Sequence, residues 1–465
     1  MDKATLLYDY DNYYQYKERK MDMKVKLLGS VALAAALVLG ATGCGSNSDS
    51  EPIPTEDSVT LPKKAQTLTT YADIALANYT DALNDAKSLN TAIDTFVATP
   101  NETNFEAAKT AWKIARESYG TTEIFRLSNG PIDAEEGFAT AWGTPEGQLN
   151  AWPLDENMID YTVDSSGATT SGNIIDTVGN FTPSGSEATT VDATTITKDV
   201  LAALNENGGD ANVATGYHAV EFLLWGQDQD YNSFLDDTVT NGATTAGQRP
   251  LTDYTSGTNV QRRKDYLVAA SELIVDDLQD MVDAWTEGSG SYREAFLGSG
   301  SNAISTDDAL KQVFIGMGKF VKSELANERM AVAILTPSEE DEHSCFSDNT
   351  HVDVTTNYQG FVNVLKGEYK GSSKGTGFYS LLSAATKADV DTLIASIDSK
   401  MAAMNMAVST EHFDYQIKDG SSHKENLNSA KNELRNLGDA MVDVAGEFGI
   451  SLTEDDVTDP DETSV

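Results

Sequence analysis

The stretch GYHAVEFLLWGQD, residues 216–228, is apolar on nearly every side when it is read as a helix. Its apolar side chains cover two sides of that helix: Val220, Leu223 and Leu224 on one, Phe222 and Trp225 on the other. Such a helix is expected to be buried on most of its faces. His218 and Glu221 lie three residues apart and therefore share one face. A carboxylate there is costly unless it is hydrogen-bonded, paired with a cation or bound to a metal.

Helical periodicity continues from this stretch along most of the chain. The predicted helices cover residues 65–97, 103–127, 197–206, 212–226, 260–286, 306–335, 355–367, 377–383, 387–407 and 424–448. Residues 162–196 are rich in Thr, Ser and Gly and indicate a long loop or weak strands. No alternation of strands with helices appears, so the predicted fold class is all-α.

Long helix pairs on either side of about residue 250 indicate two helical-bundle domains. The predicted division of the chain is an N-terminal extension with a signal peptide, a polar tether, two helical-bundle domains and an acidic tail. These parts cover residues 1–43, 44–63, 64–248, 249–452 and 453–465.

Composition limits the partners. The 465 residues include 73 acidic and 32 basic side chains, a formal charge of -41. No basic patch could follow a phosphate backbone, so nucleic acid is excluded as a partner. The surface is expected to be anionic and to attract cations diffusely. The two cysteines, Cys44 and Cys345, form no zinc-binding spacing.

The N-terminal region predicts export. Lys24 and Lys26 precede an apolar run over 27–39 that is too short to span a bilayer. The ending Ala-Thr-Gly-Cys at 41–44 resembles a bacterial lipobox, in which Cys44 is lipidated and anchors the protein. Gly45 then favours the outer membrane, with the protein facing the periplasm or the surface. Ordinary cleavage with release of a secreted protein is the alternative.

The expected start of translation lies after residue 20. Residues 1–20 fit no signal pattern. Met21 or Met23 is therefore the expected start in place of Met1.

Two other helices carry polar stripes. One stripe, in 103–127, holds Arg116, Tyr119, Glu123 and Arg126; the other, in 306–335, holds Glu324, Glu328 and Arg329. Each stripe alone is typical of a solvated surface with salt bridges. If both converge on His218 and Glu221, the carboxylates and the imidazole form a site suited to iron, zinc or manganese.

The sequence resembles the imelysin family, which includes the iron-regulated protein A and insulin-cleaving metalloproteinase groups. Residues 216–221 match its G-x-H-x-x-E signature, and six segments around the signature also read as family sequence. These segments are EIFRLSNGPID, LNAWPLDENMIDY, ANVATGYHAVEFLLWGQD, RRKDYLVAASELIVDDL, GMGKFVKSELANERMAVAIL and EDEHSCFSDNTH. The resemblance covers about residues 65–455.

The resemblance implies two domains, each built around a four-helix bundle, with the signature in a cleft between them. It also implies a metal site. His218 and Glu221 are the signature pair, Glu123 resembles a metal-binding glutamate of iron-uptake relatives, and Glu328 is the next candidate ligand. Arg126, Tyr119, Glu324, Arg329 and His343 are the expected supporting residues.

The family also carries a metallopeptidase label. A catalytic zinc needs three protein ligands and an open position, which His218, Glu221 and either His343 or His351 could supply, with Glu123 or Glu328 as the base. A buried structural pair satisfied by Arg126 and Tyr119, with no ligand, is a further alternative.

The sequence therefore predicts an envelope lipoprotein that binds a metal ion, iron, for uptake or handling. Its partners are the membrane, through its lipid anchor, and other iron-uptake components. A zinc metallopeptidase is the alternative.

Overall fold

The computed structural model describes residues 59–163, 168–228, 244–335 and 341–459. Cys44, the signal segment and the candidate starts Met1, Met21 and Met23 lie outside these residues. The described chain is dominated by helices, and its strands are four of two residues each. The predicted all-α class is confirmed.

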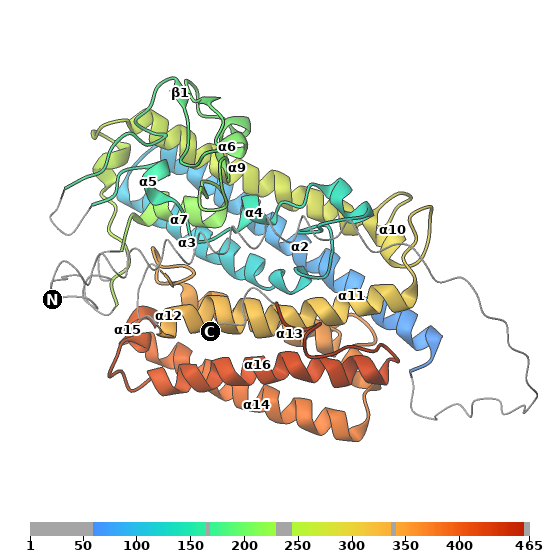
Figure 1. Ribbon diagram of the computed structural model, residues 1–465. Coiled ribbons are helices and arrows are strands. Elements are labelled where there is room, and N and C mark those ends of the chain that lie inside the picture. The colour runs from blue at the N-terminus through green and yellow to red at the C-terminus, as the bar shows by residue number, and fades with distance from the viewer. Residues whose placement is uncertain (1–58, 164–167, 229–243, 336–340, 460–465) are drawn as a thin grey trace, which may run out of the picture. The chain divides into compact units, whose positions relative to one another are not determined.

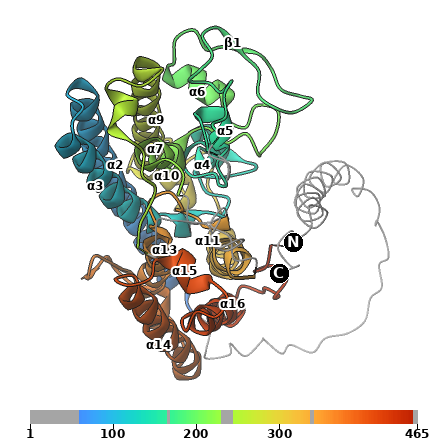
Figure 2. The same cartoon turned by 90° about the vertical axis from the view of Figure 1, so that its left-hand side faces the viewer.

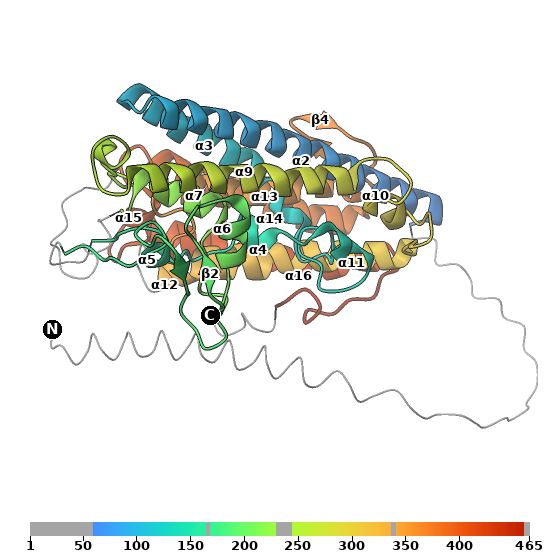
Figure 3. The same cartoon turned by 90° about the horizontal axis from the view of Figure 1, so that it is seen from above.

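One group of helices consists of α2 (Leu61–Ala98), α3 (Glu102–Gly120), α7 (Gly216–Trp225) and α9 (Val260–Trp285). Both α3 and α9 pack along α2, as Figures 1 and 3 show, and α7 packs on α9 and α3 (Figure 2). The turn from α2 to α3 is fixed at Asn101, whose side chain accepts a hydrogen bond from the Asn104 amide at 3.0 Å. This is an N-cap, which satisfies one of the free amides at a helix start.

A second group begins with a continuous helical segment over 306–335. It consists of α11 (Thr306–Lys319), the π-helix η5 (Phe320–Ala331) and α12 (Val332–Leu335). This segment packs against α16 (Lys424–Glu447), which also packs along α14 (Ala384–Ala407) and contacts α15 (Phe413–Ile417). Between the groups, α13 (Thr350–Lys366) contacts α3, η5 and α14.

Short elements make the connections. The helical ones are η1 (Glu123–Phe125), η2 (Phe138–Trp142), α4 (Glu146–Leu149), α5 (Glu156–Ile159), α6 (Lys198–Leu204), η4 (Leu251–Tyr254), α10 (Tyr292–Phe296) and η7 (Phe378–Leu381). The strands form two antiparallel pairs, β1 (Asn180–Phe181) with β2 (Val191–Asp192) and β3 (Glu368–Tyr369) with β4 (Ser372–Ser373). The first pair falls in the segment 162–196, for which the composition indicated a loop or weak strands.

The structure differs from the sequence prediction at the end of one helix and in the packing of another. The helix predicted over 103–127 ends at Gly120, where α13 packs so closely that a Cβ on Gly120 would lie 2.1 Å from Thr356 Oγ1. Glu123 therefore lies on the separate 3-10 helix η1. In addition, α9 follows residue 249 in the chain but packs on α2, in the first group. The predicted domain limits stay predictions.

The start of the predicted acidic tail packs on the protein. Val457 is fully buried, and a Cβ on Gly318 of α11 would lie 2.6 Å from its side chain. Nearby, a Cβ on Gly438 of α16 would lie 2.8 Å from the Gly318 carbonyl oxygen. The two glycines therefore let α11 and α16 approach closely, and Val457 lies against the same part of α11.

No helix of the described chain is both long and apolar enough to cross a bilayer.

Candidate functional site

The motif glycine is required by the backbone. Every residue of α7 is buried, and Gly216 at its start has φ +80°. A Cβ at this position would lie 2.3 Å from the carbonyl oxygen of Leu149. Glycine alone adopts this backbone region freely and permits this contact. The close approach places the start of α7 beside Asn150, which is part of the buried polar cluster described below.

Glu221 is held by a residue far away in the sequence. Its Oε1 accepts two hydrogen bonds from Ser347, one from the backbone amide at 2.9 Å and one from the hydroxyl at 2.7 Å. Burial raises the pKa of Glu221 to about 8, although the Ser347 hydrogen bonds act to lower it. The carboxyl group is thus fully buried and hydrogen-bonded, without an arginine or lysine ion pair among the described residues.

His218 is held through one ring nitrogen. Its Nδ1 lies 3.2 Å from Glu221 Oε2. Its Nε2 is buried and has no hydrogen-bond partner among the described residues. Either Nδ1 donates to an ionised Glu221 or a protonated Glu221 donates to Nδ1, and both arrangements leave Nε2 without a partner. Burial, together with the positive charges of nearby groups such as Arg116, holds the pKa of His218 well below its usual range.

A second imidazole faces His218. The rings of His218 and His343 stand edge to face, with centroids 4.8 Å apart and planes at 80°. His343 Nδ1 lies 2.8 Å from Asp353 Oδ2 and 3.1 Å from an Nη of Arg116. Burial and the guanidinium groups of Arg329 and Arg116 lower the pKa of His343 well below its usual range. Both imidazoles are therefore neutral at pH 7, which is the form that binds metals.

Arginines surround Glu123. Arg329 lies 2.5 Å from its Oε2, and Arg116 lies 3.6 Å from its Oε1. Asn150 donates to Oε2 and Asn357 donates to Oε1, each at 3.1 Å. Burial acts to raise the pKa of Glu123, but the two arginines outweigh it and the pKa is lowered. Glu123 is thus a buried anion with a full set of partners.

The π-helix determines which residues of the second stripe meet. A π-turn brings residues five apart into line, where an α-helix aligns residues four apart. Accordingly, Arg329 donates to Glu324 Oε1 from Nη at 2.7 Å and from Nε at 3.1 Å. Arg126 donates to the same oxygen at 2.8 Å. Within the second stripe, Glu324 and Arg329 therefore pair on η5.

The structure brings most of the predicted residues together. Contacts join His218 to Glu221 and to His343, and arginines link Glu123 to Asp353 on one side and to Glu324 on the other. Tyr119 is buried beside Tyr217, with ring centroids 4.9 Å apart and Arg116 over both rings. Glu328 is half-buried on η5 and is not part of the contacts just described.

Several residues of the cluster were not singled out from the sequence. They are Ser347, Asp353, Asn150 and Asn357. Serine and asparagine occur on most protein surfaces, so composition carries no signal for them. Asp353 precedes the helix predicted over 355–367, and the observed helix α13 begins earlier, at Thr350, and includes it.

The signature pair and the all-α fold agree with one family. The model of the family described as imelysin matches residues 75–441. The chain belongs to the imelysin family.

A curated imelysin relative is iron-regulated protein A of Synechococcus elongatus, which is 23% identical over 312 residues. The match covers 65% of this chain and 64% of the relative, so the chain spans less than two thirds of that protein.

Two solved structures share the imelysin fold. One is a candidate iron-regulated protein A precursor from Parabacteroides distasonis, with a TM-score of 0.56 and 17% identity. The other is an imelysin-like protein from Psychrobacter arcticum, with a TM-score of 0.52 and 13% identity. Each comparison covers 85% of this chain and 98% of the other. These likenesses concern the fold alone.

Proposed function

We propose that this imelysin-family chain is an envelope lipoprotein that binds a metal ion, iron, in the uptake or handling of that metal. The observation that carries the proposal is the buried Nε2 of His218, which has no partner among the described residues. A buried nitrogen without a partner loses the hydrogen bonds that it makes with water. A metal ion at this nitrogen would remove that cost.

The surroundings of His218 suit a metal ligand. A metal-binding histidine usually directs its other ring nitrogen to a carboxylate or carbonyl, which fixes the tautomer and the ring. The Glu221 carboxylate lies at Nδ1 of His218, and the Asp353 carboxylate lies at Nδ1 of His343. The two imidazoles would therefore be the ligands, and Glu221 and Asp353 would be the residues that orient them.

The two imidazoles would be only part of the ligand set. Among the described ranges, no three His, Cys, Asp or Glu side chains are grouped so as to hold a metal. Glu123 is already bound by arginines, and Ser347 occupies one oxygen of Glu221. Direct ligation by Glu123, Glu221 or Glu328 stays a prediction. Water or a small chelating anion would complete the coordination of a metal bound by two histidines.

Metal binding should stabilise the fold through His218. Fe²⁺ under anaerobic conditions, or Zn²⁺, is expected to raise the melting temperature of the wild type. A ligand at a hundredfold excess over its dissociation constant adds about 2.7 kcal/mol to the free energy of unfolding. His218→Ala should abolish most of this gain. Differential scanning calorimetry with and without metal measures it, alongside metal analysis of protein purified without chelator.

His423→Ala is the matched control because His423 is partly exposed and lies at the N-cap of α16, outside the His218 cluster. It should keep the full gain. An equal gain in His218→Ala would show that the metal binds to diffuse surface charge. The wild type is not expected to cleave an unfolded polypeptide. If it did, and if a chelator or His218→Ala abolished the cleavage, the protein would be a zinc peptidase and not an iron-handling protein.

The lipid anchor is the second part of the proposal, and it rests on the lipobox-like residues 41–44. Cys44→Ser should move the protein from the membrane fraction to the soluble envelope fraction, because the acylated residue is lost. Cell fractionation with immunoblotting measures this. Fractionation that is unchanged from the wild type would contradict the anchor. A lipid anchor would place the protein beside membrane components of iron uptake, its proposed partners.

A further inference from the structure

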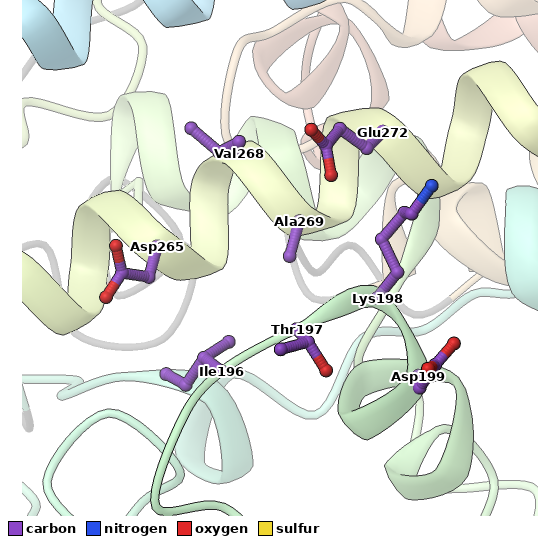
Figure 4. Close-up of a pocket in the computed structure, with 8 residues that line it drawn as sticks. All are labelled: Ile196, Thr197, Lys198, Asp199, Asp265, Val268, Ala269 and Glu272. Atoms are coloured by element: carbon purple, nitrogen blue, oxygen red, sulfur yellow. The ribbon is translucent and has the colours of Figure 1, made fainter.

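The two imidazoles of the proposed metal site are closed off from solvent. The exposed fraction of His218 is 1%, and that of His343 is 2%. A pocket of about 330 Å³ lies between the start of α6 and the middle of α9 (Figure 4). None of the residues that line this pocket is among the hydrogen-bond or ring contacts of the two imidazoles. A metal ion therefore reaches the ring nitrogens only after a residue that covers them has moved.

One residue of this cover has a solvent-exposed surface. Within the described chain, hydrogen bonds and ring contacts join the two imidazoles to each other and to Glu221, Asp353, Arg116 and Trp152. The first three of these residues are completely buried, whereas Trp152 is half-buried. The Trp152 ring stands edge to face with the His343 ring, with centroids 5.7 Å apart. Among these contacts, Trp152 is thus the one through which the buried cluster borders on solvent.

The backbone around Trp152 is held at two points. On one side, the Asn150 side chain is bonded within the buried polar cluster. On the other side, the Asp155 amide donates to the Val213 carbonyl oxygen at 3.0 Å. Between these points, residues 151–154 make no hydrogen bond with any described residue. Segments with few hydrogen bonds open at a low cost in free energy, so Trp152 can swing outward while both ends stay in place.

We propose, on the basis of the metal binding proposed above, that Trp152 is a gate whose displacement admits a divalent metal ion to His343 and His218. The indole N–H group can only donate a hydrogen bond and has no lone pair for a metal. Trp152 is therefore not a ligand. It controls the rates at which the metal enters and leaves, and it leaves the affinity of the closed site unchanged.

Release rate and affinity together test the gate. Fe²⁺ would be bound under anaerobic conditions, its release followed by stopped-flow capture with an excess of a chromophoric chelator, and its dissociation constant measured by isothermal titration. Trp152→Ala should release Fe²⁺ about tenfold faster than the wild type, with the dissociation constant unchanged to within about threefold. The dissociation constant is the ratio of the two rates, and the loss of a gate raises both rates equally. Trp152→Phe keeps a smaller ring and should release Fe²⁺ about threefold faster, which tests the gate even if the alanine variant does not fold.

Trp142→Ala is the matched control. Trp142 is also half-buried, on η2, and is not among the contacts of the two imidazoles described above. This variant should release Fe²⁺ at the wild-type rate. Circular dichroism checks that each variant is folded.

The possible results separate the gate from the metal site. Wild-type release from the folded Trp152 variants, or equal acceleration in Trp142→Ala, would contradict the gate and leave metal binding in place. A dissociation constant that rises as much as the release rate would show that Trp152 positions His343, and it would also contradict the gate. A wild type that binds no Fe²⁺ would contradict the proposed function itself.

Discussion

Replacing Glu123 by alanine is expected to lower the free energy of unfolding by about 3–5 kcal/mol, the usual cost of removing one partner from a buried ion pair. Arg116 and Arg329 are almost completely buried, and both use this carboxylate as a counter-ion. Alanine would also leave the amide groups of Asn150 and Asn357 without their acceptor. Urea denaturation at pH 7 measures the change.

Glu117→Ala is the control for this prediction. Glu117 is exposed on α3, six residues before Glu123 in the chain. Its replacement should change the free energy of unfolding by less than about 0.5 kcal/mol, as is usual for surface positions. If Glu123→Ala were as mild as this control, the arginines around Glu123 would not depend on it, and the buried network would be assigned wrongly.

The second large effect is expected at the motif glycine. Gly216→Ala would force a side chain into a left-handed backbone conformation, which costs about 1–3 kcal/mol. The new Cβ would also meet the Leu149 carbonyl oxygen at 2.3 Å, and relieving that contact should cost about 1–3 kcal/mol more. Because α7 begins at this residue, His218 should move as well. The metal-dependent gain in melting temperature should therefore fall together with stability.

Gly288→Ala serves as its control. Gly288 follows α9 in an exposed turn, and a Cβ there would meet no atom within 4 Å. Its melting temperature and its response to metal should match those of the wild type. A Gly216→Ala protein with wild-type stability would show that α7 can begin in another conformation, and the structural reason given for the motif glycine would be wrong.

The helices were largely predictable because apolar residues recur with the helical period over long stretches. The helix predicted over 260–286, for example, is observed as Val260–Trp285. The residues that form the buried polar cluster around His218 and Glu123 were predictable only in part. Glu123 was selected as a member of an α-helical stripe, yet it reaches the cluster from η1, after the helix has ended at Gly120. That ending depends on contact with α13, which a local pattern does not contain.

Two further features required the tertiary structure. The period of 3.6 residues places Glu324, Glu328 and Arg329 on one stripe without saying which of them meet, whereas the π-helix pairs Glu324 with Arg329. The sequence offered a metal, or Arg126 and Tyr119, as partners of the signature pair, and it gave no sign of Ser347, which donates to Glu221 from 126 residues later in the chain. A short stretch of sequence does not show whether a buried helix is an α-helix or a π-helix. It also does not show a contact between residues more than a hundred positions apart.

The burial of Val457 against Gly318 shows that packed residues continue beyond residue 452. Composition places the end of the domain at about residue 452, since acidic residues follow. The structure carries the chain onward, and the amide of Asp459 donates to the Ser323 hydroxyl at 2.8 Å. A truncation chosen from acidity alone would remove a core side chain from the place where α11 and α16 approach each other. Residues 453–459 are thus part of the packing that holds the second group of helices together.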